Sequence, residues 1–323
     1  MSGQTTPRRS AGQPSAGPGR AGRHSVVHRP PTRDLGLLAV GVVAVSTSAP
    51  LIAATVAPAI AIAFWRNAFG TLAIAPFALG RQLGEMRSLA RREWFLILGA
   101  GLVLALHFAT WVPSLRYTSV ASSTAMVATQ PVWSALIARL QGHHVAARVW
   151  VGISVAFAGV LLLTGVDFNL EPRALVGDFL ALVGAVFAAA YVAMGSAVRR
   201  TVTTTTYTFL CYGVCAVLLL VVCLVAGLQL RGYSGDTWLK LLALTAGAQL
   251  LGHSVFNVVL RSTSPTVVSL AILFEMPGAT IIAAAWLGQA PPLAVYPAAA
   301  LLLLGTAVVV RSQGAEPTDV LPS

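Results

Sequence analysis

The chain has 323 residues, of which 56% are hydrophobic and only 10% are charged, and its formal net charge is +11. A soluble domain carries about a quarter charged residues, so this composition argues against a soluble globular protein. A charge of this size also occurs in nucleic-acid-binding proteins, but the placement of the basic residues along the chain argues against nucleic acid as a partner.

The apolar residues form ten long runs rather than amphipathic stripes. Each run has roughly 19–25 residues, which is enough for a helix to cross a hydrocarbon core of about 30 Å. Helices are expected because a chain inside lipid must satisfy its backbone hydrogen bonds internally, whereas a barrel would show shorter alternating runs. The predicted spans are residues 35–54, 57–79, 94–114, 119–139, 148–166, 176–197, 204–227, 238–260, 265–286 and 292–311.

The basic residues predict the orientation of these spans. With the N-terminus in the cytoplasm, 16 of the 21 Lys and Arg residues fall on the cytoplasmic side, and Arg66 falls inside a span. The remaining four, on the outer side, are Arg116, Arg173, Arg231 and Lys240. This positive-inside bias predicts a multi-pass protein of the inner (plasma) membrane with both termini in the cytoplasm.

The chain also repeats one pattern at an offset of 146 residues. At this offset Pro131 aligns with Pro277 and His107 with His253, together with several glycines and serines. Each half then holds five spans, and because five is odd, the second half enters the membrane in the opposite orientation. Inverted repeats of this kind recur in secondary transporters.

The predicted organisation follows from the spans and the repeat. A disordered basic tail at 1–33, rich in Gly, Pro, Ser, Thr and Arg, precedes the first five-helix half at 34–166. The second half covers 174–311, and a short cytoplasmic tail covers 312–323. The fold class expected is therefore an all-α membrane protein with ten transmembrane helices in two inverted five-helix repeats.

Three stretches carry a resemblance to a known family. They are "FWRNAFG" around Arg66 in the second span, "YTSVASSTAMVATQPVWSAL" in the fourth and "SPTVVSLAILFEMPGATIIAAAWLGQ" in the ninth. With ten spans in two halves, residues 35–311 resemble the EamA family of the drug/metabolite transporter superfamily. The family's Leu-Glu-Pro-like element in the ninth span reads Phe274-Glu275-Met276-Pro277 here, with a methionine between acid and proline.

This resemblance implies a helical bundle around a central cavity that is lined mainly by the first, third, fourth, sixth, eighth and ninth helices. It also implies export or exchange of small metabolites. The motifs are mostly apolar, so they indicate a superfamily and no particular substrate, and amino acids, amines and drugs all remain candidates.

Glu275 is the first candidate for a functional residue. It stands about ten residues into its span, or roughly 15 Å along a helix, near the middle of the membrane. An ionised residue at that depth costs about 2.5–3.5 kcal/mol, so Glu275 is expected to face a cavity or a partner. It is a candidate for proton coupling or for binding a substrate amine, with a structural carboxyl as the alternative.

The prolines of the two halves are interpreted as structural. Pro277 and Pro131 cannot donate to the carbonyls of Leu273 and Val127, so each is expected to kink its helix. The freed carbonyl can bend the helix or accept a hydrogen bond from ligand or water.

Two histidines occupy matching positions in the third and eighth spans. His107 is followed four residues later by Trp111, and His253 by Asn257, so each pair shares one helix face. These four residues are predicted to contribute to substrate binding, with neutral hydrogen bonding inside the bundle as the alternative.

The fourth span supplies a further pair of candidates. Thr129 is the repeat equivalent of Glu275, and Trp133 follows it on the same helix face. Both are predicted to bind substrate, with packing between helices as the alternative. The resemblance puts an arginine at the position of Arg66, which favours a buried structural role, although the side chain could also hold an anionic substrate group.

The function predicted is secondary transport of small metabolites by alternating access around a central cavity. A membrane-embedded enzyme with His107, His253 and Glu275 on a metal is the first alternative, and a passive facilitator or scaffold is the second. The chain has no nucleotide-binding or hydrolase motif, and no catalytic residue, cofactor or metal is predicted. The expected partners are a small-molecule substrate and the bilayer, and a homodimer is left open.

Overall fold

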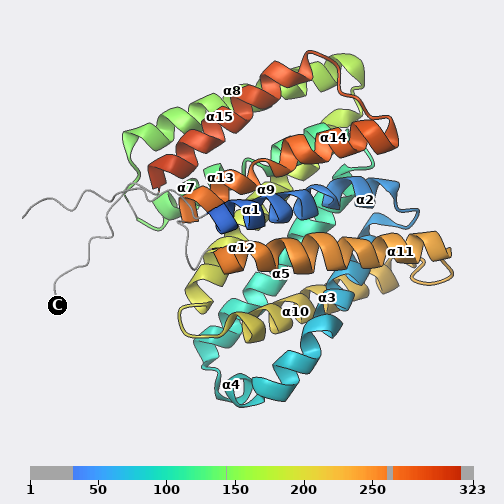
Figure 1. The fold of residues 1–323 in the computed structure, drawn as a ribbon, viewed down its shortest axis with the longest axis vertical. Coiled ribbons are helices and arrows are strands. Elements are labelled where there is room, and N and C mark those ends of the chain that lie inside the picture. Colours follow the sequence, from blue (N-terminus) through green and yellow to red (C-terminus); the bar gives the residue numbers. More distant parts are fainter. Residues whose placement is uncertain (1–31, 143, 260–264, 314–323) are drawn as a thin grey trace, which may run out of the picture.

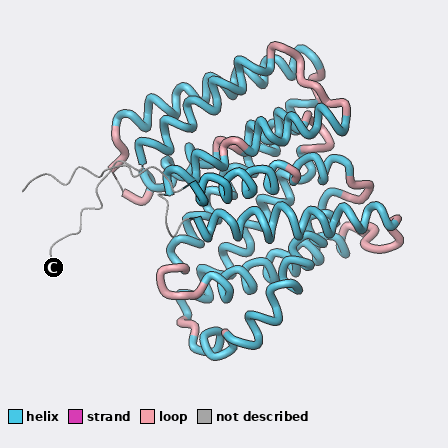
Figure 2. Tube along the Cα trace, viewed as in Figure 1, coloured by secondary structure: helices cyan, strands magenta, loops and turns pink. Residues whose placement is uncertain are grey.

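The computed structural model describes residues 32–142, 144–259 and 265–313. Within these ranges the chain is helical with short connections, and none of it forms a strand (Figure 2). The helices are α1 (Thr32–Ser46), α2 (Ser48–Ala54), α3 (Ala59–Arg81), α4 (Leu83–Ser88), α5 (Arg91–Ser114), α6 (Val120–Val127), α7 (Gln130–Leu140), α8 (Ala147–Leu170), α9 (Ala174–Val198), α10 (Thr204–Val225), α11 (Gly235–Ala243), the π-helix η1 (Leu244–Gly252), α12 (His253–Val259), α13 (Pro265–Ile272), α14 (Glu275–Leu287) and α15 (Val295–Gln313).

Several of these helices are consecutive pieces of one membrane pass. α1 and α2 form the first pass, α6 and α7 the fourth, α11, η1 and α12 the eighth, and α13 and α14 the ninth (Figure 1). With α3, α5, α8, α9, α10 and α15, the described chain makes ten passes. Eight helical segments are long and apolar enough to cross a membrane, and Ala147–Leu163 is a shorter apolar helix. The predicted all-α membrane fold in two five-helix halves is confirmed.

The fourth and ninth passes break at equivalent points of the two halves. α6 ends at Val127 and α7 begins at Gln130, while α13 ends at Ile272 and α14 begins at Glu275. Pro131 and Pro277 therefore stand in the first turn of the helix after each break, where a proline costs no hydrogen bond. The chain follows the same course twice, 146 residues apart, within the usual uncertainty of helix ends.

The ends of the same two passes also match. Gly142 follows α7 with φ 89° and Gly288 follows α14 with φ 67°, and the offset of 146 relates these two residues. A left-handed residue after a helix satisfies its last carbonyls, and glycine takes this conformation without the steric cost of a side chain.

The contacts between passes keep the same pattern when the two halves of the chain are interchanged. α3 packs on α10 and α8 on α15, so the second and fifth passes meet their own counterparts. α5 packs on α9, and the counterpart contact joins η1 and α12 to α1. α6 and α7 pack on α9 just as α13 and α14 pack on α1. This reciprocity is what a structural duplication produces.

The α8–α15 contact is the closest approach between two passes. A Cβ placed on Gly159 would lie 2.5 Å from the backbone nitrogen of Leu302, and one on Gly152 would lie 2.8 Å from the carbonyl oxygen of Gly305. Small residues let two helix backbones approach closely inside a membrane, where packing rather than hydrophobicity holds helices together. Gly159 and Gly305 are themselves related by the repeat offset.

The largest hydrophobic cluster lies between α3, α5, α10 and α11 and includes Ile62, Ile97 and Leu241, all fully buried. Large apolar side chains also cover the outside of the bundle, for example Phe95 on α5 and Val225 on α10. An exterior of this kind is stable only in contact with hydrocarbon, which agrees with a bundle that spans a bilayer.

Candidate functional site

The most polar part of the bundle interior is centred on Arg66. Its side chain is only 4% exposed, although it stands in the middle of an apolar helix, α3. Its Nε donates to Oε1 of Gln249 on η1 at 2.8 Å, and its Nη1 donates to the hydroxyl of Ser48 on α2 at 3.3 Å. Both acceptors are neutral, so neither hydrogen bond compensates the positive charge of the guanidinium.

Two aromatic rings of α5 cover the same guanidinium. Its central carbon lies 4.7 Å from the ring centroid of Phe108 and 6.0 Å from that of Trp111. The negative face of an aromatic ring attracts a cation, and the attraction strengthens where water is excluded. Arg66 is therefore stabilised by rings and amides rather than by an acid.

The nearest acid on another element is Glu275, the first residue of α14. The charges of Arg66 and Glu275 interact across the interior, but no carboxylate oxygen of Glu275 lies within 4 Å of the guanidinium. Among the described residues the Glu275 carboxyl accepts no hydrogen bond, and the residue is only half-buried. The N-terminus of α14 also favours negative charge at this position.

His107 and Trp111 form the aromatic wall of the cluster. The rings lie 5.5 Å apart with an angle of 18° between their planes, and Nδ1 of His107 lies 2.9 Å from the carbonyl oxygen of Gly184 on α9. This contact makes Nδ1 the protonated nitrogen in a neutral ring, because a carbonyl can only accept. Nε1 of Trp111 is buried and has no hydrogen-bond partner among the residues that the structure describes.

The first pass reaches the cluster through its break at Thr47. Ser48, after the break, accepts from Arg66, and the hydroxyl of Ser46, before it, lies 3.4 Å from the backbone oxygen of Glu275. A Cβ on Gly278 would collide with Ser46, so α14 and α1 pass at close range here. The two serines therefore approach both charged residues of the cluster.

The cluster draws its residues from both halves of the chain. Ser48, Arg66, His107 and Trp111 come from the first half, and Gln249 and Glu275 from the second. Arg66 stands about 10 Å from the start of α3 along the helix axis, so the cluster lies well inside the membrane-spanning region. Its cation and its acid come from different halves, and no salt bridge joins them among the described residues.

A family model decides what kind of protein carries this cluster. The model of the EamA-like transporter family matches residues 34–165 and again residues 175–311. The chain belongs to the EamA-like transporter family. This is a family of membrane transporters and not of enzymes, and membership implies secondary transport.

Other comparisons add information on the fold alone. A solved structure described as "Crystal structure of protein" is 19% identical to this EamA-like transporter, with a TM-score of 0.61, and the match covers 88% of this chain and 99% of the other. No curated protein matches the chain with significant similarity.

The predicted residues of the fourth pass lie in a different environment. Nε1 of Trp133 donates to the hydroxyl of Thr129 at 3.1 Å, and that hydroxyl donates to the carbonyl oxygen of Met126 at 2.6 Å. The Trp133 ring also packs edge-on against Phe157 of α8. These bonds stabilise the break between α6 and α7, and among the described contacts none joins either residue to Arg66.

The remaining predicted residues belong to the eighth pass of this EamA-like transporter. His253 and Asn257 stand on α12, but their side chains lie outside the residues whose side chains the structure describes. Among the described residues, no group of three His, Cys, Asp or Glu side chains is arranged to hold a metal ion. The metalloenzyme alternative is disfavoured by membership in a family of transporters rather than enzymes.

Sequence reasoning missed two polar partners of Arg66. Gln249 and Ser48 both stand inside predicted apolar spans, and an amide at such a depth is itself a signal of a functional or paired position. Gln249 also lies within a π-helix, and the extra residue per turn in π segments often marks functional sites. The break of the first pass at Thr47 was likewise not predicted, although Pro50 stands third in α2 just as Pro277 stands third in α14.

Proposed function

We propose that this EamA-like transporter exports or exchanges a small polar metabolite by alternating access, with the substrate bound between the halves 34–166 and 174–311. The observation that carries the proposal is the arrangement of Arg66 and Glu275. They belong to opposite halves, and neither has an oppositely charged group in direct contact among the described residues. Substrate sites at repeat interfaces near mid-membrane are a feature of secondary transporters.

The chemistry of the cluster favours a substrate with two polar ends. An anionic or hydrogen-bond-accepting group fits beside Arg66 and the unpartnered Nε1 of Trp111, and a cationic or donor group fits beside Glu275. His107 and Trp111 supply flat apolar faces between them. Amino acids and amines with a carbonyl group have this character, so they are the first compounds to test.

Several residues have separate roles in this proposal. Glu275 is the candidate proton carrier, and His253 and Asn257 complete the substrate site from the eighth pass. Thr129 and Trp133 contact the substrate only if the break between α6 and α7 moves, because their polar atoms now bond to each other. Pro131 and Pro277 shape the breaks, and Arg66 gains a binding role beyond the structural one.

The conformation described here is closed around the cluster. Arg66, His107 and Trp111 are each less than a tenth exposed. A separate cavity of about 560 Å³ opens at the far end of α2 and is lined by residues that include Thr55, Arg116 and Tyr233. We infer that movement of α2 joins this cavity to the cluster in a second state.

The arginine bias supports the inner membrane with both termini in the cytoplasm, and a homodimer stays a prediction.

Two measurements test the proposal. A thermal-shift screen of amino acids, amines and related metabolites identifies compounds that raise the melting temperature of the purified protein, because ligand binding stabilises the folded state. The compounds found are then assayed in proteoliposomes with an imposed pH gradient. We expect gradient-driven flux in wild type and in Glu171→Gln, a loop control, and its loss in Glu275→Gln. Unchanged coupling in Glu275→Gln would remove Glu275 from the proposed role.

A further inference from the structure

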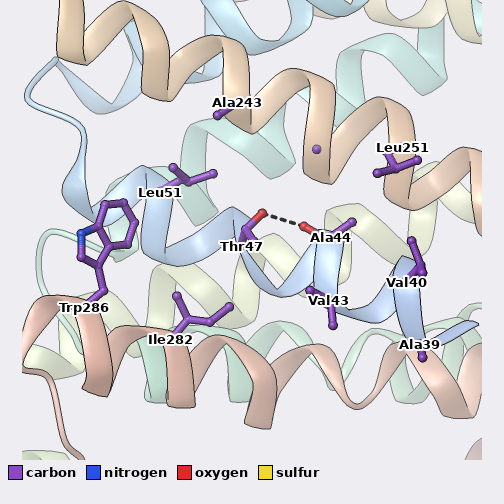
Figure 3. Close-up of a pocket in the computed structure, with 11 residues that line it drawn as sticks. Ala39, Val40, Val43, Ala44, Thr47, Leu51, Ala243, Leu251, Ile282 and Trp286 are labelled. Carbon is purple, nitrogen blue, oxygen red and sulfur yellow. Dashed lines mark hydrogen bonds between the residues drawn. The ribbon is translucent and has the colours of Figure 1, made fainter.

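A long apolar groove lies on the outside of the bundle, along the first pass. It has a volume of about 680 Å³ and runs along α1 and α2, with η1 on one side and α14 on the other (Figure 3). Its lining residues are Ala39, Val40, Val43, Ala44, Thr47, Leu51, Ala243, Gly247, Leu251, Ile282 and Trp286. All belong to segments long and apolar enough to span the membrane.

The groove offers a polar ligand little to bind apart from the indole N–H of Trp286. Thr47 is the one lining residue with a polar side chain apart from the indole of Trp286, and its hydroxyl already donates to the carbonyl oxygen of Ala44 at 2.7 Å (Figure 3). The residues at the rim face outward, since Val43 is 63% and Leu251 48% exposed. In a membrane the medium next to these side chains is hydrocarbon.

The dimensions of the groove favour a thin occupant over a helix. From Val40 to Leu51 the helix rises about 17 Å, which gives the groove a cross-section of roughly 40 Å². A helix with its side chains is about 10–12 Å wide, so its cross-section is about twice as large. A helix of a second copy would therefore rest on the rim and leave the floor of the groove empty, whereas an unbranched hydrocarbon chain fits inside it.

We propose that the groove binds one acyl chain of a bilayer phospholipid, laid along α1 and α2 across the break at Thr47. Since the alternative for the chain is bulk lipid, the stabilisation comes from close packing rather than from the hydrophobic effect. Trp286, at the α2 end of the groove, suits the interface where the chain meets its headgroup (Figure 3).

The acyl chain and the polar cluster lie on opposite sides of the first pass. Thr47 lines the groove, while its neighbours Ser46 and Ser48 approach Glu275 and Arg66 from the other side of the break. A chain in the groove therefore packs against the segment of the first pass that contacts both charged residues. This lipid site does not depend on which metabolite the cluster binds.

Photocrosslinking tests the acyl-chain site directly. The full-length protein is reconstituted in nanodiscs with phosphatidylglycerol that carries a diazirine in one acyl chain, and adducts are mapped by mass spectrometry. We expect adducts to concentrate on the groove residues of α1, η1 and α14. Gly247→Leu fills the groove, because a Cβ there has only Oγ1 of Thr47 nearby, at 3.9 Å. It should lower these adducts about fivefold, a difference near 1 kcal/mol.

The matched control is Gly36→Leu, the same change at an exposed site of α1 with no atom within 4 Å of its Cβ. It should leave the groove adducts unchanged. Adducts spread evenly over the outer helices, or an equal yield in Gly247→Leu and wild type, would overturn the proposal. Displacement of the adducts by a transported metabolite would overturn it too, because the groove would then belong to a substrate route.

Discussion

The guanidinium of Arg66 donates a 2.8 Å hydrogen bond from Nε to the side-chain oxygen of Gln249, 183 residues away. A buried arginine usually pairs with an acid, because an uncompensated charge inside a protein is costly. Here an amide, a serine and two aromatic rings stabilise the charge of Arg66, and Glu275 remains out of direct contact with it. In the function we propose, this arrangement keeps a cation and an acid available inside the membrane for a substrate.

The Arg66–Gln249 bond should be important for stability. Gln249→Leu removes the acceptor and leaves a buried, charged donor unsatisfied, which costs about 2–3 kcal/mol. We therefore expect a clearly lower melting temperature in detergent. Gln229→Leu, in an exposed loop, is the matched control and should change stability by less than about 0.5 kcal/mol. Equal melting temperatures for Gln249→Leu and wild type would show that the bond contributes nothing.

A substitution at Trp111 should distinguish an effect on ligand binding from an effect on the stability of the fold. Trp111→Phe keeps an aromatic ring but removes three ring atoms, among them an Nε1 that has no hydrogen-bond partner in the described part of the chain, so stability should fall by about 1–2 kcal/mol. If Nε1 donates to the substrate, the same variant loses ligand-induced stabilisation in the thermal-shift assay. Trp94→Phe, at the start of the same helix and outside the cluster, should retain it. Full ligand stabilisation in Trp111→Phe would exclude the indole N–H from binding.

Close packing between α8 and α15 predicts strong sensitivity to a single methyl group. Gly159→Ala places a carbon 2.5 Å from the backbone nitrogen of Leu302, and a helix backbone cannot move aside without repacking. We expect a loss of about 1–3 kcal/mol, seen as a lower melting temperature. Gly36→Ala, with open space around the new methyl group, should be neutral or slightly stabilising. If the two variants had the same melting temperature, the backbones of α8 and α15 would not be in contact.

Glu85 on α4 links the two halves outside the membrane and should make stability depend on pH. Its carboxylate accepts 2.8 and 2.6 Å hydrogen bonds from the backbone nitrogen and hydroxyl of Thr203, and a further bond from the hydroxyl of Thr206. Partial burial raises the pKa of Glu85, but the hydrogen bonds outweigh this effect and hold the pKa below its ordinary value of 4.5.

A lowered pKa in the folded state means that the carboxylate stabilises the protein above the ordinary value, and that this contribution is lost as the pH falls through the folded-state pKa. The melting temperatures of wild type and Glu85→Gln should therefore differ most near neutral pH and converge in acid. The difference will be small, because the site is largely exposed. A gap that widens as the pH falls would contradict the assignment. Glu171→Gln, in the loop before α9, is the control for a general charge effect.

The sequence predicted the passes well because each one is a long apolar run. It predicted kinks at Pro131 and Pro277, and the structure has a break between two helices just before each proline. The alignment of the halves also came from simple identities, and Gly142 and Gly288 now share the same backbone conformation. These features depend on short stretches of chain, where composition and spacing are sufficient.

The composition of the site was harder to predict. Hydropathy does not say which face of a fully apolar helix points inward, so the pairing of Arg66 with Gln249 could not be inferred from either span. Thr129 and Glu275 are equivalent in the repeat, yet the threonine hydroxyl bonds within its own helix break while the Glu275 carboxyl accepts no described bond. Symmetry of the backbone does not fix the partners of the side chains.

The most direct test of the central claim is the accessibility of position 275 from each side of the membrane. Glu275→Cys is introduced after replacement of Cys211, Cys215 and Cys223 by alanine, and a membrane-impermeant thiol reagent is added on one side of oriented vesicles at a time. Alternating access predicts labelling of position 275 from both sides. Labelling from a single side only, or no labelling of the folded protein, would contradict a substrate site between the two halves.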